Sequence, residues 1–145
     1  GTLMNAGNFA PLLFVGLAAS GGPPRLWSLL FAFVGLLLQN QLVHEAADAE
    51  EDQRGKVRTT FLVLGQRGAA VLALLCGGLV LGATLHLLRR VGAPWPWALH
   101  ALPYLTFFPA QLAFHGGSAE RMARARLTQR WAAAASGLLL FALDP

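Results

Sequence analysis

The residues best suited to chemistry lie in the stretch 40–60, NQLVHEAADAEEDQRGKVRTT, which holds five of the seven acidic residues of the chain and three of its eleven basic ones. Within this stretch, candidate side chains recur at every fourth position: Asn40, His44, Asp48 and Asp52. On an α-helix each step of four residues turns the side chain by only about 40°, so the four form one slowly drifting stripe. Two carboxylates one helical turn apart can share a hard cation such as Mg²⁺.

Basic residues follow this acidic stripe. Lys56 and Arg58 come directly after it and are suited to binding an anion. Acidic residues and then cations at the end of an apolar helix favour a site for a metal ion and a phosphorylated ligand. A plainer interpretation, a solvated face of a helix at the membrane surface, stays open from charge alone. A zinc-protease HExxH motif is not indicated, because Asp48 stands where the second histidine would be.

The composition indicates a membrane protein. The 145 residues are 55% apolar and only 12% charged, with a mean hydropathy of +0.52. A soluble domain usually has about 25% charged residues. The net charge of +4 does not indicate nucleic-acid binding, because the basic residues cluster in loops without interleaved aromatic residues. The single cysteine, Cys76, lies in an apolar run and is expected to be a buried, inert thiol.

The pattern of apolar stretches predicts an all-α fold: a polytopic helical bundle with about five transmembrane helices in one domain, residues 1–145. In lipid the backbone must satisfy its own hydrogen bonds, so the spans are helices. The second stretch runs on into the acidic stripe, and Gly55 ends it. The fifth is shorter than the roughly 20 residues of a span and must borrow Ala125–Arg130. The predicted spans are residues 3–19, 26–43, 68–88, 95–114 and 131–143.

Three local signals refine these helices. Small residues in the third stretch, Gly77, Gly78 and Gly82, would let neighbouring helices approach closely. Pro103 and Pro109 are expected to kink the fourth stretch. His86 and His100 are expected to be interior or interfacial residues rather than ligands.

Loop charges predict an orientation. With five spans, the loops after the second and fourth stretches lie on one side of the membrane and carry eight basic residues, whereas the other side carries three. The positive-inside rule therefore places the acidic stripe in the cytoplasm, at a bacterial-type inner membrane. The arginines of the second of these loops, Arg121, Arg124, Arg126 and Arg130, are chiefly topology determinants, although they could also hold a diphosphate.

The stripe and the residues that follow it resemble a known motif. His44-x-x-x-Asp48-x-x-x-Asp52, followed by Arg58-Thr59-Thr60 and a Phe61–Gly65 tail, is similar to the second aspartate-rich motif of the UbiA-type intramembrane prenyltransferases. The layout agrees as well, since members of that family are nine-helix bundles with this motif after the sixth helix. The five predicted spans would then correspond to helices five to nine.

The resemblance implies Mg²⁺-dependent transfer of a polyprenyl group from its diphosphate to a lipophilic, often aromatic, acceptor, as in quinone biosynthesis. It implies that Asp48 and Asp52 hold Mg²⁺ and act in catalysis. Arg58 and, more weakly, Lys56 would contact the diphosphate, while His44 and Asn40 would contact substrate. The expected partners are the prenyl diphosphate, the acceptor and the lipid bilayer.

One departure and two alternatives remain. The family also uses a first motif of the form NDxxDxxxD, which is absent here as a separate copy. With neither an initiator Met nor a signal-peptide pattern at Gly1, we expect this chain to be the C-terminal part of a longer enzyme and inactive without its N-terminal half. The main alternative is a non-catalytic membrane protein, a transporter half or an assembly subunit, with a cytoplasmic cation or partner site. A CDP-alcohol phosphotransferase is disfavoured, because no Asp precedes Asp48.

Overall fold

The described part of the chain is helical throughout. The computed structural model describes residues 24–142, and the first predicted span, 3–19, lies outside this range. The elements are α2 (Pro24–Ala47), α3 (Ala49–Arg54), α4 (Thr60–Val91), the 3₁₀-helix η1 (Trp95–Ala101), α5 (Leu102–Leu105), α6 (Phe107–His115) and α7 (Ala119–Ala142). This confirms the all-α prediction for residues 24–142.

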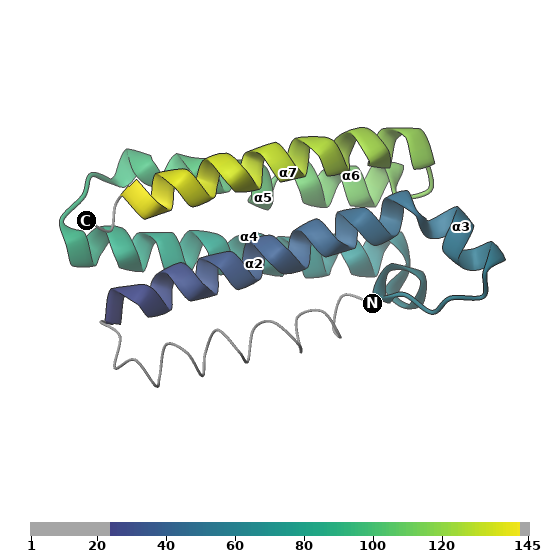
Figure 1. Cartoon of the computed structure of the whole chain (residues 1–145), viewed down its shortest axis with the longest axis horizontal. Coiled ribbons are helices and arrows are strands. Elements are labelled where there is room, and N and C mark those ends of the chain that lie inside the picture. The colour runs from purple at the N-terminus through teal and green to yellow at the C-terminus, as the bar shows by residue number, and fades with distance from the viewer. Residues whose placement is uncertain (1–23, 143–145) are drawn as a thin grey trace.

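Within residues 24–142, three long helices and one broken segment pack side by side (Figure 1). α2 lies between α4 and α7 and packs on both, while η1, α5 and α6 pack on α4. The short α3 extends from the end of the bundle at which α6 turns into α7 (Figure 1). The turn from α4 to η1 lies at the opposite end.

Among the described residues, two helices are long and apolar enough to cross a membrane, Leu26–Ala47 and Thr60–Val91. The buried core helix of a soluble protein can meet the same criterion. In α4, however, a row of large apolar side chains is exposed: Val71, Leu74, Leu75, Leu79 and Leu85. An uncovered apolar face of this length favours contact with lipid or with another protein over contact with water.

The fourth predicted span is divided into three short elements. It consists of η1, α5 and α6, with an interruption at Thr106, where φ is −120° and ψ is −63°. Pro103 and Pro109 each lie in the first turn of a new short helix, where the missing N–H is tolerated. Helical hydrogen bonds nevertheless run across this interruption, from the Thr106 N–H to Leu102 O at 3.0 Å and from the Ala110 N–H to Thr106 O at 3.1 Å. Pro109, three residues after Thr106, has no N–H to donate, so the interruption agrees with the kink predicted from this proline.

Glycine allows the closest helix contact. A Cβ built on Gly77 would lie 2.3 Å from the carbonyl oxygen of Tyr104, so α4 and α5 touch backbone to backbone there. The predicted role in close packing holds for Gly77. It does not hold for Gly78 and Gly82, where an added Cβ meets nothing within 4 Å among the described residues.

The core is centred on the broken segment. Tyr104, Phe108 and Leu112 are fully buried against Leu42 and Val43 of α2. Polar side chains are buried among these apolar ones. The Gln39 amide nitrogen donates to the carbonyl oxygens of Ala73 at 2.8 Å and Tyr104 at 2.7 Å. Gln39 thereby joins α2 to both α4 and α5.

Candidate functional site

The predicted stripe lies where α2 ends. Asn40 and His44 are on α2, Asp48 is the N-cap of α3, and Asp52 is on α3. Asp48 has φ of −97° and ψ of 5°, which interrupts the helix by one residue. Helical spacing persists across the interruption, because the Asp48 N–H bonds to His44 O at 3.1 Å and the Asp52 N–H to Asp48 O at 2.9 Å. The hydrogen-bond pattern therefore continues across the interruption, with the stripe divided between two helices.

An arginine side chain from α7, Arg126, contacts this face. The Nδ1 atom of His44 is 2.7 Å from Oδ2 of Asp48. Arg126 places Nη1 3.4 Å from Oδ1 of Asp48 and Nη2 2.8 Å from Nε2 of His44. The three residues, called the His–Asp–Arg cluster below, join the end of α2 to the first half of α7.

The geometry of the cluster fixes the proton on the imidazole. A guanidinium has donors only, so the Nε2 atom of His44 must accept from Arg126. The Nδ1 atom then carries the hydrogen and donates to Asp48. The negative charge of Asp48 is matched by Arg126.

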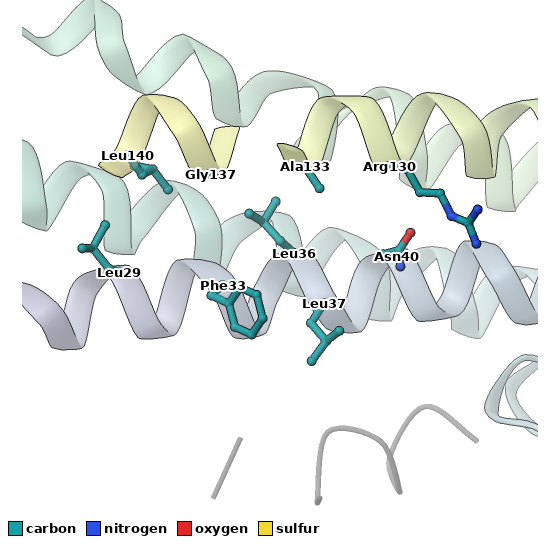
Figure 2. A pocket seen from close by; sticks show the side chains of 9 residues that line it. All are labelled: Leu29, Phe33, Leu36, Leu37, Asn40, Arg130, Ala133, Gly137 and Leu140. Atoms are coloured by element: carbon teal, nitrogen blue, oxygen red, sulfur yellow. The ribbon is translucent and has the colours of Figure 1, made fainter. Parts of the chain in front are cut away.

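A groove between α2 and α7 begins beside the cluster. It has a volume of about 470 Å³. Its walls are apolar along most of its length, and Figure 2 shows Asn40 and Arg130 together at one end, with Leu29 and Leu140 toward the other. Arg130 is one helical turn from Arg126 on α7, and Asn40 is one turn from His44 on α2. The groove thus leads from an apolar interior to the charged face.

Two polar atoms next to this charged end are buried and have no hydrogen-bond partner within the described range 24–142: the Oδ1 of Asn40 and the Nε of Arg126. A buried polar atom normally has a partner, and leaving it without one costs about 1–3 kcal/mol. One is an acceptor and the other is a donor, and the protein encloses both in the present side-chain positions.

The predicted diphosphate residues lie elsewhere. Lys56 and Arg58 are exposed on the loop after α3 and share a shallow hollow with Gln53, Val57, Leu62 and Val63. Among residues 24–142, no ion pair joins Lys56, Arg58 or Asp52 to another side chain. The structure therefore brings Asn40, His44 and Asp48 together with Arg126 and Arg130, and it leaves the loop cations apart from them.

The metal prediction can be compared with the residues present. Across the described residues, no group of three or more His, Cys, Asp or Glu side chains could enclose a metal ion. Mg²⁺, however, is usually bound by one or two carboxylates together with substrate phosphates and water. Asp48 and Asp52, one turn apart, fit this open kind of site and not a closed one.

The loop that follows the stripe is held by a residue that the sequence analysis did not single out. Glu45 is almost fully buried, and its Oε2 accepts from the Phe61 N–H at 2.9 Å. This N–H belongs to the first turn of α4, where no intrahelical acceptor exists. Thr59 caps the same turn, with its Oγ1 3.3 Å from the Leu62 N–H. Together they return the chain from α3 to the bundle.

A second polar group lies deeper in the bundle. His100 places Nε2 3.1 Å from Thr84 Oγ1 and Nδ1 3.0 Å from Ser136 Oγ, and Tyr104 Oη is 3.0 Å from the same Ser136 oxygen. His100 is thus an interior residue with partners on α4 and α7, as predicted, while His86 is exposed. Every described polar side chain in this group has a partner, so it is a structural link between helices.

Comparison with known proteins adds no relative: no family model, no curated protein and no solved structure matches the chain.

Proposed function

We propose that this chain is the membrane-embedded C-terminal part of a UbiA-like prenyltransferase, which transfers a polyprenyl group from its diphosphate to a lipophilic acceptor. The observation that carries the proposal is the α2–α7 groove. It has apolar walls and ends at Asn40 and Arg130, one helical turn from the His–Asp–Arg cluster. An isoprenoid diphosphate has this same division into a long apolar chain and a highly charged head.

The residues would divide the work as follows. Asp48 and Asp52 would hold Mg²⁺, which supplies charge neutralisation to the leaving diphosphate. Arg126 and Arg130 would bind the diphosphate oxygens, since a guanidinium matches the geometry of phosphate. Asn40 would accept a hydrogen bond from substrate or bound water. The apolar groove would exclude water from the allylic centre.

In this proposal Lys56 and Arg58 attract the anionic ligand from a distance and do not bind it directly. Both are exposed on the loop beside α3, at the same end of the bundle as the cluster (Figure 1). Exposed cations at the mouth of a site raise the local concentration of an anionic ligand. The first aspartate-rich motif and the remaining metal ligands would come from the N-terminal half of the same enzyme.

The membrane placement is part of the proposal. The two helices that meet the criterion for a span, together with the exposed apolar row of α4, support an integral, multi-pass protein. We propose five spans, with the broken segment and α7 among them and the acidic stripe on the cytoplasmic side. Non-helical backbone at membrane depth is tolerated where other helices cover it, and α4 packs against η1, α5 and α6.

Turnover by the complete protein tests the function. Release of diphosphate would be measured in membranes with a panel of prenyl diphosphates and acceptors, with and without Mg²⁺. We expect Asp48→Asn and Asp52→Asn each to lower kcat by roughly 100-fold or more, because the charge stabilisation supplied by a metal is worth several kcal/mol. Glu51→Gln, an exposed acid between the two, is the matched control and should retain activity.

The same experiment identifies the alternative. A transporter half or assembly subunit would bind Mg²⁺ and diphosphate in stoichiometric amounts without releasing any product. Turnover that is unaffected by both Asp substitutions would keep the enzyme and remove the assignment of its metal site.

A further inference from the structure

The carboxylate of Asp48 already has a positive partner. Its Oδ1 faces Arg126 at 3.4 Å and its Oδ2 faces His44 at 2.7 Å. The charge of Asp48 is therefore already matched by a cation from another helix. A divalent cation held by Asp48 would compete with the guanidinium of Arg126 for the negative charge of this carboxylate.

The contact is of a kind that can be exchanged. The side chains of Asp48 and Arg126 are 37% and 26% exposed, so water screens their attraction. Partly exposed pairs of this type contribute little to stability. The 3.4 Å separation is long for a charge-assisted hydrogen bond, which is usually about 2.7–2.9 Å.

Arg126 also has somewhere else to bind. Its buried Nε lacks a partner among residues 24–142, so the guanidinium has an unused donor. Arg130, one turn further along α7, lines the charged end of the groove with Asn40 (Figure 2). Arg126 does not line the groove itself, so its side chain would have to turn toward this end to meet an anion bound there.

We propose that Arg126 is an exchangeable counter-ion: it neutralises Asp48 before ligand binds and transfers to the anionic head group when a divalent cation takes its place. The inference rests on the proposed function and adds the order in which the cation and the diphosphate bind. A cation binding at Asp48 releases the residue that holds the diphosphate, so each ligand strengthens the binding of the other. Such coupling is reciprocal by thermodynamic necessity.

The test uses the full-length protein in lipid nanodiscs, with Mn²⁺ as the cation probe and inorganic diphosphate as the anion probe. Free Mn²⁺ is measured by electron paramagnetic resonance without diphosphate, and diphosphate binding by calorimetry at saturating Mg²⁺. Arg126→Gln should bind Mn²⁺ about two- to fivefold more tightly, because a weak competing pair is gone. It should bind diphosphate roughly tenfold or more weakly, because a charged hydrogen bond is lost.

The matched control is Arg124→Gln. Arg124 is on the same helix, but its side chain is exposed and paired with Glu120. We expect both affinities of this variant to equal those of the unmodified protein. Opposite changes in the two affinities of Arg126→Gln support the exchange. Weaker binding of both ligands, no change in either, or no binding by the unmodified protein overturns it.

A second measurement needs no substitution, and so covers the case in which Arg126→Gln fails to fold. Arginine modification by phenylglyoxal is followed at each residue by peptide mass spectrometry. Mn²⁺ alone should increase modification of Arg126, and added diphosphate should reverse the increase, while Arg124 stays constant. If Mn²⁺ leaves the extent of Arg126 modification unchanged, the inference is overturned.

Failure of the inference differs from failure of the proposed function. Turnover with unchanged affinities in Arg126→Gln removes the exchange and keeps the transferase. Exchange without any turnover keeps the inference and favours the non-catalytic alternative.

Discussion

Gln39 and Tyr104, 65 residues apart, are joined by a 2.7 Å hydrogen bond from the side-chain amide of one to the backbone carbonyl of the other. The bond lies at the level where Gly77 lets α4 and α5 meet. On its other side, the Gln39 Oε1 accepts from the fully buried Gln129 of α7 at 3.3 Å. One buried amide on α2 therefore contacts α4, the broken segment and α7.

Replacing this amide should loosen the bundle. Gln39→Leu keeps most of the volume but removes the donor to Ala73 and Tyr104. We expect a loss of about 1–2 kcal/mol in the free energy of unfolding, because two hydrogen bonds between helices are lost and each contributes about 0.6 kcal/mol on average in a membrane protein. Unfolding in mixed detergent micelles measures it. Gln41→Leu, two positions along the helix and outside these bonds, should change the free energy by less; an equal change would contradict the assignment.

Gly65 should resist substitution for a reason of backbone geometry. It has φ of 66° and ψ of 176° inside α4, a combination that is essentially restricted to glycine. An added Cβ would meet nothing within 4 Å among the described residues, so backbone strain is the main effect. Gly65→Ala should cost about 1–3 kcal/mol in the free energy of unfolding.

The control substitution, Gly78→Ala, should change the free energy of unfolding in the opposite direction. Gly78 also faces open space, but in regular helix. Gly78→Ala should therefore stabilise α4 by about 0.5–1 kcal/mol, because alanine loses less conformational entropy than glycine. Thermal unfolding of both variants under one set of conditions compares them, and destabilisation of equal size would refute the interpretation.

Glu45 should be a structural acid and not a catalytic one. Glu45→Ala removes the acceptor of the Phe61 N–H and should cost about 1–3 kcal/mol in the free energy of unfolding. Glu45→Gln keeps an acceptor oxygen and should retain most of the stability and most of the turnover. Glu51→Ala, an exposed acid on α3, should stay within about 0.5 kcal/mol. Loss of turnover in a folded Glu45→Gln variant would instead assign it to the chemistry.

The orientation can be checked with single cysteines in a Cys76→Ser background. The exposed positions Glu51 and Arg121 lie at one end of the bundle and Arg90 at the other. In intact cells a membrane-impermeant maleimide should label Arg90→Cys only, and in inverted vesicles Glu51→Cys and Arg121→Cys only. Labelling of all three from the same side would exclude the proposed topology.

Local features of the fold could be predicted from the sequence. The helical stripe through Asn40, His44 and Asp48, the end of α3 before Gly55 and the end of α4 before Gly92 all depend on residue type and spacing over a few positions. Gly92 has φ of 67°, the left-handed conformation that commonly ends a helix. These signals involve neighbours in the chain and need no tertiary information.

The partners of the stripe could not be predicted in this way. Arg126 stood among four arginines of similar spacing, and only the packing of α7 against α2 sets which one meets Asp48. Lys56 and Arg58 were favoured because they are near in sequence, yet the short α3 carries them away from the cluster. Gln39 gave a usable signal, since an uncharged polar residue inside an apolar run indicates a partner on another helix.

The pairing of Arg126 with Asp48 also has a consequence for biogenesis. The two residues are 78 positions apart, and α7 is the last described helix to be synthesised. Until α7 leaves the ribosome and docks, Asp48 has no cation from that helix at the end of α2. A nascent chain that stalls before this point therefore keeps an uncompensated acid at the mouth of the bundle, which distinguishes it from the finished protein.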